Sequence, residues 1–280
     1  MRSVNNLAGL AGNNAYRYLY YILLCAGLIE SRARRLCDMA KRVVQHLRRH
    51  NWAAPDLVKL QQRWYQSLQN NEPDYGVYIV DEYLVESWAC WMIYSRKYIR
   101  EIAKPSSMPP DGVARQVSLG GTIVDLGNGM GISTAALKQL FPKSRVIGTN
   151  IADTSQWKIA TALAAAYGFE MIDDTEIIYD PVDLVFASEY FEHFEHPIQH
   201  LTKIIADIHP RYMLIANAFT SQAIGHFNHY YDADIQLTGK QTSRYFNGAM
   251  QQAGYEKVVT RLWNNRPALW VRTENNKETT

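Results

Sequence analysis

Hydrophobic and polar positions follow two alternating patterns over residues 120–273. Short apolar runs alternate with longer segments in which apolar residues recur at the three- and four-residue spacing of a helix. This alternation predicts an α/β fold with a doubly wound, Rossmann-like sheet, and the last two strands are expected to form an antiparallel hairpin. The predicted strands are residues 122–126, 145–150, 169–172, 183–188, 212–218, 256–262 and 268–273, and the predicted helices are residues 133–140, 156–167, 197–208 and 242–253.

The first 110 residues lack this alternation and are predicted to be helical. Residues 15–50 and 55–69 have helical spacing, and a dense group of aromatic residues follows between Tyr78 and Tyr98. At helical spacing these aromatic side chains form either a packed core or the roof of a substrate pocket. The proline-rich stretch 104–112 is the predicted linker. We therefore expect a helical cap or substrate lid over residues 1–110, an α/β domain over residues 111–273 and a disordered tail over residues 274–280.

Basic residues are concentrated in the predicted cap. The net charge is +2, but residues 1–110 carry 15 Lys/Arg and 9 Asp/Glu, whereas the remainder carries 14 and 18. A basic helical face is typical of a surface that binds phosphate, as in nucleic-acid recognition. It is equally typical of the solvated face of a packed helix. The sequence leaves both interpretations open.

The cysteines and the apolar runs indicate the compartment. Cys25, Cys37 and Cys90 are far apart and form no Cys-x-x-Cys pair. We therefore expect neither a disulfide framework nor a structural zinc site, which favours a reducing compartment. The apolar run of residues 18–29 is too short to span a bilayer and lacks a secretory cleavage pattern. These features predict a cytoplasmic protein without a membrane span.

A glycine turn joins the first predicted strand of the α/β domain to its helix. Gly127, Gly129 and Gly131 let the backbone turn sharply and approach a ligand without Cβ atoms in the way. Ser133 and Thr134 follow directly and are candidate caps for the helix. The turn is therefore the predicted binding site for a nucleotide-like ligand.

The spacing of the glycines decides which ligand suits the turn. A dinucleotide fingerprint, Gly-x-Gly-x-x-Gly, would need glycine at position 132, where the chain has Ile132. Asp125, two residues before Gly127, would repel a pyrophosphate and suits a cation such as the amino group of a methionine moiety. A nicotinamide or flavin domain and a turn without a ligand are the alternatives.

The motif Asp125-x-Gly-x-Gly-x-Gly131 resembles the first motif of class I S-adenosylmethionine-dependent methyltransferases. The resemblance covers about residues 120–273 and implies S-adenosyl-L-methionine as the cofactor. In this family the second strand usually ends in Asp or Glu, whereas here it ends in Asn150. The resemblance implies cofactor contacts for Asp125, Gly127, Asn128, Gly129, Gly131, Asn150, Gln156, Asp174, Ser188 and Glu189.

Two of these cofactor assignments have structural alternatives. Gln156 resembles a glutamine that helps to hold the cofactor in cyclopropane-fatty-acid-synthase-like methyltransferases, or it only begins a helix. An acid after the third strand commonly accepts a hydrogen bond from the adenine amino group in the family. Asp173 and Asp174 are both candidates, of which we prefer Asp174, and a plain helix cap is the alternative.

The run Phe191-Glu-His-Phe194, after the fourth strand, resembles the same run in the cyclopropane-fatty-acid-synthase-like group. It implies that Glu192 and His193 face the transfer zone, where His193 takes a proton from the acceptor. A histidine bonded to the backbone is the structural alternative. The predicted irregular segment 220–242 adds candidates, because loops of this length are usually functional. The candidate catalytic residues are Glu192, His193, His226, His229 and Tyr231, and we expect no metal ion.

These features predict an enzyme that methylates an O, N or C nucleophile of a small molecule. The alternatives are a nucleic-acid or nucleotide methyltransferase that uses the basic N-terminal helices, and a cofactor-binding regulatory module without catalysis. The Asn/Asp-Pro-Pro-Tyr/Phe and Pro-Cys motifs of DNA base methyltransferases are absent. We expect the cap to close over the acceptor, so that residues 112–280 alone would retain some cofactor binding and lose methyl transfer.

Overall fold

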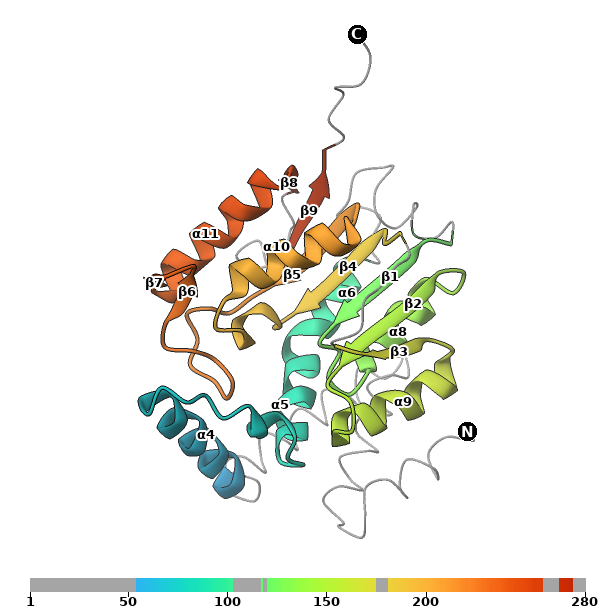
Figure 1. The fold of residues 1–280 in the computed structure, drawn as a ribbon. Helices are drawn as coiled ribbons and strands as arrows, with labels where there is room; N and C mark the ends of the chain where they lie inside the picture. Colours follow the sequence, from blue (N-terminus) through green and yellow to red (C-terminus); the bar gives the residue numbers. More distant parts are fainter. Residues whose placement is uncertain (1–53, 103–116, 118–119, 175–180, 259–266, 274–280) are drawn as a thin grey trace.

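A mostly parallel sheet forms the centre of the structure (Figure 1). A computed structural model describes residues 54–102, 117, 120–174, 181–258 and 267–273. Within them a seven-stranded sheet has the order β3-β2-β1-β4-β5-β9-β8, with β1 to β5 parallel and β9 antiparallel to both β5 and β8. The strands are β1 (Thr122–Leu126), β2 (Arg145–Asn150), β3 (Glu170–Asp173), β4 (Leu184–Ser188), β5 (Tyr212–Ala216), β8 (Tyr255–Val258) and β9 (Ala268–Arg272). The predicted doubly wound fold with a terminal antiparallel pair is confirmed.

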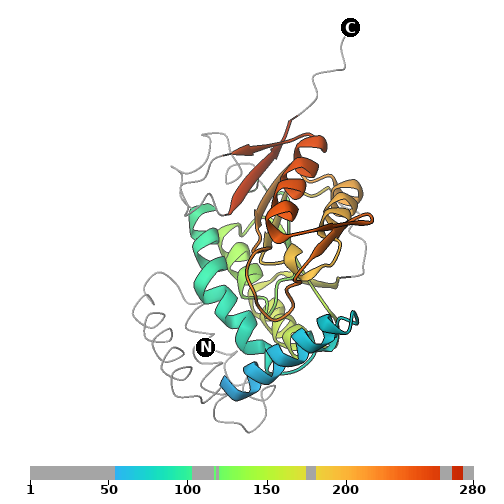
Figure 2. The same ribbon diagram turned by 90° about the vertical axis from the view of Figure 1, so that its left-hand side faces the viewer.

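Helices cover both faces of this sheet and the carboxyl ends of its strands (Figure 2). The α/β domain contributes α8 (Ile132–Leu140), α9 (Ser155–Tyr167), η5 (Phe191–His193), α10 (Pro197–Ile208) and α11 (Gly239–Gln252). The described part of the predicted cap contributes α4 (Ala54–Gln69), η2 (Tyr75–Tyr78), α5 (Tyr83–Cys90), η3 (Trp91–Ser95) and α6 (Arg96–Ile102). A small separate sheet pairs β6 (Tyr230–Asp232) with β7 (Ile235–Leu237).

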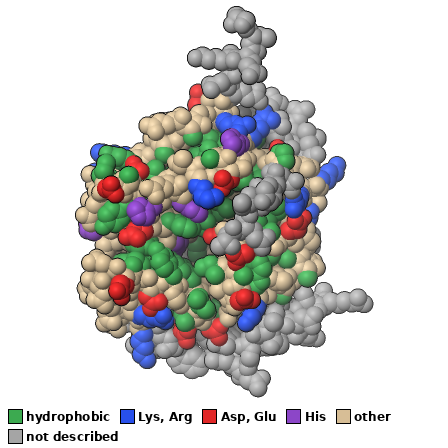
Figure 3. All heavy atoms as spheres, viewed as in Figure 1, with side chains coloured by type: hydrophobic (Ala, Val, Ile, Leu, Met, Phe, Trp, Pro, Cys, Tyr) green, Lys and Arg blue, Asp and Glu red, His purple; other side chains and the backbone are tan. Residues whose placement is uncertain are grey.

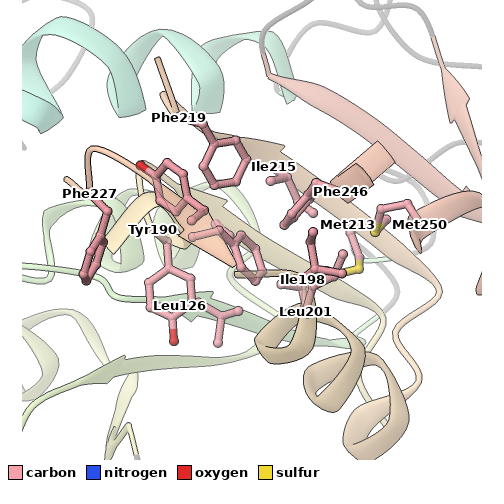
Figure 4. Packing of buried hydrophobic residues seen from close by; sticks show 14 of the residues in the cluster. Leu126, Tyr190, Ile198, Leu201, Met213, Ile215, Phe219, Phe227, Phe246 and Met250 are labelled. Carbon is pink, nitrogen blue, oxygen red and sulfur yellow. The ribbon is translucent and has the colours of Figure 1, made fainter. Parts of the chain in front are cut away.

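Alternate residues of the central strands enter two hydrophobic clusters, one on each face of the sheet. On β4, Leu184 and Phe186 pack with α5, α6, α8 and α9, whereas Val185 and Ala187 pack with α10 and α11. Figure 4 shows the second cluster, in which side chains of α10 and α11 lie against β5. Because both faces are covered, these strands are continuously apolar, as is usual in parallel sheets.

The described part of the cap packs into both clusters. Trp88 of α5 and Tyr98 of α6 are buried on the α8 side of the sheet, whereas Trp64 of α4 is fully buried in the other cluster. The Trp64 Nε1–H donates to the carbonyl oxygen of His226 at 2.7 Å. Part of the aromatic group that the sequence placed in the cap is therefore core of the α/β domain.

Two elements near the C-terminus differ from their predicted form. Helix α11 begins at Gly239, earlier than predicted, because Thr238 and Gln241 form a capping box that satisfies the first backbone N–H groups. The segment 220–242, predicted to be irregular, contains the β6–β7 pair. The hydrogen-bonded β6–β7 pair therefore occupies part of the segment that we expected to be a loop.

The aromatic stretch of the cap, residues 78–98, is divided among several helical elements. Tyr78 ends the 3₁₀ turn η2, and α5 begins only at Tyr83. The π-helical turn η3 then separates α5 from α6. Turns of this type inside helices occur frequently at functional sites.

Several predictions lie outside the described residues. They concern residues 15–50 with their basic face, the linker 104–112, the tail 274–280, Cys25 and Cys37. Cys90, which the structure does describe, is a free thiol. In the described ranges, no helix combines the length and hydrophobicity that crossing a bilayer requires.

Gly131 and Gly168 offer a matched test of the packing at the start of α8. Both have left-handed backbones, but a Cβ at Gly131 would lie 2.9 Å from Ala160, whereas one at Gly168 would meet nothing within 4 Å. We expect Gly168→Ala to lower the free energy of unfolding by about 1 kcal/mol through backbone strain alone. Gly131→Ala adds overpacking and should cost roughly 2–4 kcal/mol. Urea denaturation measures both losses, and equal losses would contradict the contact with Ala160.

Candidate active site

A pocket of about 1000 Å³ opens at the carboxyl ends of β1, β2 and β4. Strand β1 lies between β2 and β4, so the pocket occupies the point where the strand order reverses, the usual ligand site of open α/β sheets. The cap forms its other wall. Figure 3 shows histidine and hydrophobic side chains gathered on this side of the molecule.

Most of the predicted site residues line this one pocket, although they are distant in sequence. They come from the glycine turn, the ends of β2, β3 and β4, helix α9 and the segment after β5. The predicted residues that line it are Asp125, Gly127, Asn128, Gly129, Asn150, Gln156, Asp174, Ser188, Glu189, His193 and His226.

The glycine turn has three left-handed residues, each packed against a different segment. A Cβ at Gly127 would lie 2.3 Å from the ring of Tyr190, and one at Gly129 would lie 2.2 Å from the Ser87 Oγ of the cap. Gly131 faces α9 in the same way and does not line the pocket. We expected the glycines to make room for a ligand, and the structure shows that they also make room for side chains of the protein.

Asp125 is a buried carboxyl group at the base of the turn, with 1% of its surface exposed. Its Oδ2 accepts hydrogen bonds from Ser133 Oγ at 2.6 Å and Thr134 Oγ1 at 2.7 Å. Burial raises the pKa of Asp125 to about 7, and the two hydroxyl donors act in the opposite direction. The prediction that these hydroxyls cap α8 is wrong, because Gly131 is its N-cap and no side chain makes the capping bond.

Asn150, where a carboxylate is usual in the family that the sequence resembles, braces the glycine turn. Its Nδ2 donates to the carbonyl oxygen of Gly129 at 2.5 Å, and its Oδ1 accepts from the backbone N–H of Ile151 at 2.8 Å. A carboxylate could accept the second bond but could not donate the first. The amide therefore suits this turn, and its polar atoms are directed at the protein rather than at a ribose.

A second polar chain runs from the end of β3 to α10. Asp174 accepts from Thr149 Oγ1 at 2.7 Å and from the Tyr190 hydroxyl at 3.2 Å, and that hydroxyl is 3.0 Å from His200 Nε2. Burial raises the pKa of Asp174, and burial with the nearby Lys203 lowers the pKa of His200 to about 4. Asp174, the acid that we preferred, thus faces the pocket.

The other acid of this pair has a structural role. The Oδ2 of Asp173 accepts from the backbone N–H of Ala152 at 2.8 Å, which ties the loop after β2 to β3. Asp173 does not line the pocket. Gln156, by contrast, lies in the wall and donates from Nε2 to the carbonyl oxygen of Tyr78 at 3.4 Å, so it links α9 to the cap.

His193, at the end of η5, lines the same pocket as the glycine turn. Its Nδ1 is 3.0 Å from the Tyr78 hydroxyl, and its ring meets that of His226 edge to face at 4.9 Å. Burial and the neighbouring His226 lower the pKa of His193 to about 3, although the carbonyl groups of Gly225 and Glu189 act in the opposite direction. The imidazole is therefore neutral in the folded protein at neutral pH.

Three predicted catalytic residues do not line the pocket. Glu192 is 0% exposed, and its Oε1 accepts from the backbone N–H of Ala218 at 2.7 Å, because the η5 turn directs it into the protein. His229 is exposed to solvent. Tyr231 lies beside His196, with ring centroids 5.6 Å apart. The resemblance implied that Glu192 faces the transfer zone, whereas the structure directs it into the protein. His229 and Tyr231, which the sequence offered as further candidates, also lie outside the pocket lining.

Ser188 and Glu189, at the end of β4, join the pocket wall to the cap. The Oγ atoms of Ser188 and Ser95 are 2.8 Å apart, and Glu189 accepts from the Tyr98 hydroxyl at 3.4 Å. Glu189 also has a left-handed backbone, with φ 54°. Such strain in a residue other than glycine often accompanies function.

The sequence offered the aromatic residues of the cap as a possible roof of the pocket, but it assigned none of them individually as a site residue, and it missed Tyr190. Helical spacing does not reveal which rings reach a pocket. The lining residues that no site prediction named include Tyr75, Tyr78, Tyr83, Glu86, Ser87, Cys90, Trp91, Tyr94, Tyr190 and His200. Among the described residues, no group of three or more His, Cys, Asp or Glu side chains could hold a metal ion.

Solved structures share this fold. No protein-family model and no curated protein matches the sequence. An O-methyltransferase family protein from Burkholderia thailandensis matches with a TM-score of 0.51 and 13% identity over 82% of this chain and 70% of that one. The mitomycin 7-O-methyltransferase MmcR matches with a TM-score of 0.51 and 15% identity over 89% of this chain and 74% of that one.

A further match is an O-methyltransferase family 2 protein from Planctomyces limnophilus DSM 3776, solved in complex with apigenin. Its TM-score is 0.48 at 16% identity, over 68% of this chain, and the chain spans only 59% of that protein's length. At such identities the likeness concerns the fold. The chain has the α/β fold of class I methyltransferases.

The two hydroxyls beside Asp125 give a direct test of its electrostatics. Ser133→Ala removes a donor that favours the ionised carboxylate, so we expect the pKa of Asp125 to rise above its value of about 7. Carbon-13 NMR of aspartate-labelled protein measures this pKa. Ser144→Ala is the control, because the Ser144 hydroxyl donates instead to the carbonyl of Val117. An unchanged pKa in Ser133→Ala would contradict the hydrogen bond.

Proposed function

We propose that the protein is an S-adenosyl-L-methionine-dependent methyltransferase that acts on a hydroxyl group of a small molecule. The observation that carries this proposal is one shared pocket, which both the glycine turn with buried Asp125 and the neutral imidazole of His193 line. The two solved structures with the higher TM-scores are named O-methyltransferases, which supports the proposal.

The pocket suits this cofactor in size and in charge. Its volume of about 1000 Å³ lies at the upper end of ligand pockets, so it has room for the cofactor and an acceptor together. The cofactor carries a positive sulfonium and a positive ammonium group. Asp125, Asp174 and Glu189 place carboxyl groups in the wall, and Lys203 is the only lysine or arginine among the described residues that line it. A pyrophosphate would meet few positive partners here.

The residues at the glycine turn would hold the amino-acid and nucleoside parts of the cofactor. Asp125 would attract the ammonium group, and the bare backbone at Gly129 would allow close approach. Asp174, which Thr149 and Tyr190 hold in place, would accept from the adenine amino group. When bound, the cofactor supplies an electrophilic methyl group on a sulfonium ion.

His193 would act as the base that receives the proton of the acceptor hydroxyl. A neutral imidazole can accept a proton, and His193 lines the pocket in which we propose that the acceptor binds. Its low pKa of about 3 reflects burial, which disfavours a net positive charge in the pocket. That cost would be reduced in the proposed reaction, because the positive charge gained by His193 would replace the sulfonium charge of the bound cofactor.

The cap would provide the acceptor site. Tyr75, Tyr78, Tyr83, Trp91 and Tyr94 of the cap give the pocket an aromatic wall, in which the Tyr78 ring packs edge to face against His193. Such a wall favours a flat, apolar acceptor and excludes water that would compete for the hydroxyl. The nucleic-acid alternative rested on the basic residues of the first 50 positions, which lie outside the described residues.

The first test of this proposal is cofactor binding. We expect isothermal titration calorimetry to detect binding of S-adenosylmethionine or S-adenosylhomocysteine and none of NADH. Gly129→Val should weaken binding at least about tenfold, because its side chain would collide with Ser87 and displace the turn. Gly168→Val, with a similar backbone far from the pocket, should bind normally. Preferential binding of NADH would contradict the proposed methyltransferase function.

A second test concerns the base. In a screen of small hydroxyl compounds with radiolabelled S-adenosylmethionine, we expect His193→Gln to lower kcat about 10²- to 10⁴-fold and to leave the cofactor Kd within about twofold. His229→Gln should retain full activity, because His229 does not line the pocket. If the two variants lose activity equally, the assignment of His193 as the base is wrong.

A further inference from the structure

Three segments meet at His193, and one of them belongs to the cap. The Tyr78 hydroxyl of η2 is 3.0 Å from His193 Nδ1 at the end of η5 and 3.2 Å from the carbonyl oxygen of Gly225 in the segment after β5. The rings of Tyr78 and His193 meet edge to face, with centroids 5.6 Å apart. The hydroxyl therefore lies between a ring nitrogen and a backbone acceptor.

Gly225 is required for this arrangement. Its backbone is left-handed, with φ +86°, and a Cβ there would lie 2.2 Å from the Tyr78 hydroxyl and 2.5 Å from His193 Nδ1. No other residue type would let the chain close so tightly over the pair without moving one of them. The contact is therefore built by all three segments.

The direction of the hydrogen bonds follows from the number of protons available. Burial, followed by Tyr75, Glu192 and Tyr230, raises the pKa of Tyr78 well above its usual value, so the phenol keeps its single proton. A carbonyl oxygen can only accept, so we assign the phenol proton to the bond with Gly225. The phenol oxygen is then left to accept, and we assign its donor to the Nδ1–H of His193, an imidazole whose N–H the carbonyl groups of Gly225 and Glu189 also favour.

From this geometry we infer that Tyr78 is a positioning residue that holds His193 in the Nδ1–H tautomer and so leaves Nε2 as the basic atom. This inference rests on the proposed function for its catalytic meaning. In the proposed reaction the acceptor oxygen would bond to the methyl carbon while the carbon–sulfur bond breaks, and the electron pair of that bond would stay on the sulfur of the S-adenosylhomocysteine that leaves. The hydroxyl proton would pass to the lone pair of His193 Nε2, which makes the imidazole an imidazolium. The opposite tautomer would present an N–H at Nε2 and could not receive the proton there.

Tyr78 itself is held by both parts of the protein. Its carbonyl oxygen accepts from Gln156 of α9, its ring packs edge to face on Tyr83 at 5.0 Å, and Trp64 lies 6.4 Å away. Gln156 also approaches the glycine turn, because a Cβ at Gly129 would lie 3.4 Å from its Oε1. The residue that orients the base is thus tied to the wall that would hold the cofactor.

The test is Tyr78→Phe, which removes the hydroxyl and keeps the ring. Long-range proton–nitrogen NMR of the full-length, histidine-labelled protein distinguishes protonated from unprotonated ring nitrogens, with His193 assigned from His193→Gln. We expect Nδ1–H in the natural protein and a mixture of tautomers in Tyr78→Phe. We also expect kcat for methyl transfer to fall about tenfold or more, with the KM for S-adenosylmethionine within about twofold.

Two further variants make the result specific. Gly225→Ala should shift the tautomer in the same way, because its Cβ would displace the hydroxyl. Tyr65→Phe is the matched control, since Tyr65 is a tyrosine of α4 that accepts from Gln61 and does not line the pocket. It should change neither the tautomer nor kcat.

The outcomes separate this inference from the proposed function. An Nε2–H tautomer in the natural protein, or an unchanged tautomer in Tyr78→Phe, would overturn the inference whatever the enzyme does. If the tautomer shifts as expected but S-adenosylmethionine does not bind the natural protein, the orienting contact is supported and the methyltransferase proposal fails.

Discussion

The structure depends on a turn that contains three glycines. At the three glycines after β1, side chains from three other segments occupy the space that a Cβ would fill. Tyr190 comes from the end of β4, Ser87 from the cap and Ala160 from α9. Because each contact requires a missing Cβ, the turn sets the distance between the sheet, the covering helix and the cap. The pocket has its shape because these parts converge there.

Local signals were sufficient to predict much of the fold. Strand β2 and helix α10 begin and end where the apolar pattern placed them, and Pro197 marks the start of α10. Prediction failed where a polar side chain has a distant partner. Ser133 and Thr134 look like helix caps in the sequence, but they serve the buried Asp125 of the neighbouring strand. Asp125 needs these two hydrogen-bond donors only once the chain has folded and its carboxyl group is buried.

The candidate site was predicted by region rather than by residue. The sequence placed a Glu-His pair at the end of β4, but Glu192 and His193 are neighbours on a tight turn and face different ways. Nothing in the sequence tells which of the two enters the pocket. Tyr78 is still harder to find, because it meets His193 across 115 positions of the chain. Its role follows from packing of the cap, which periodicity alone does not describe.

The electrostatics of the pocket have one cause and favour one kind of ligand. Burial raises the pKa of Asp125 to about 7 and lowers the pKa of His193 to about 3, so both groups resist charge. A positive charge near the glycine turn would favour the ionised Asp125 and would keep His193 neutral, which is the form a base needs. A negative charge would oppose both effects. The same desolvation that disfavours a pyrophosphate therefore favours a ligand with sulfonium and ammonium groups. It also keeps His193 in the neutral form that can accept a proton.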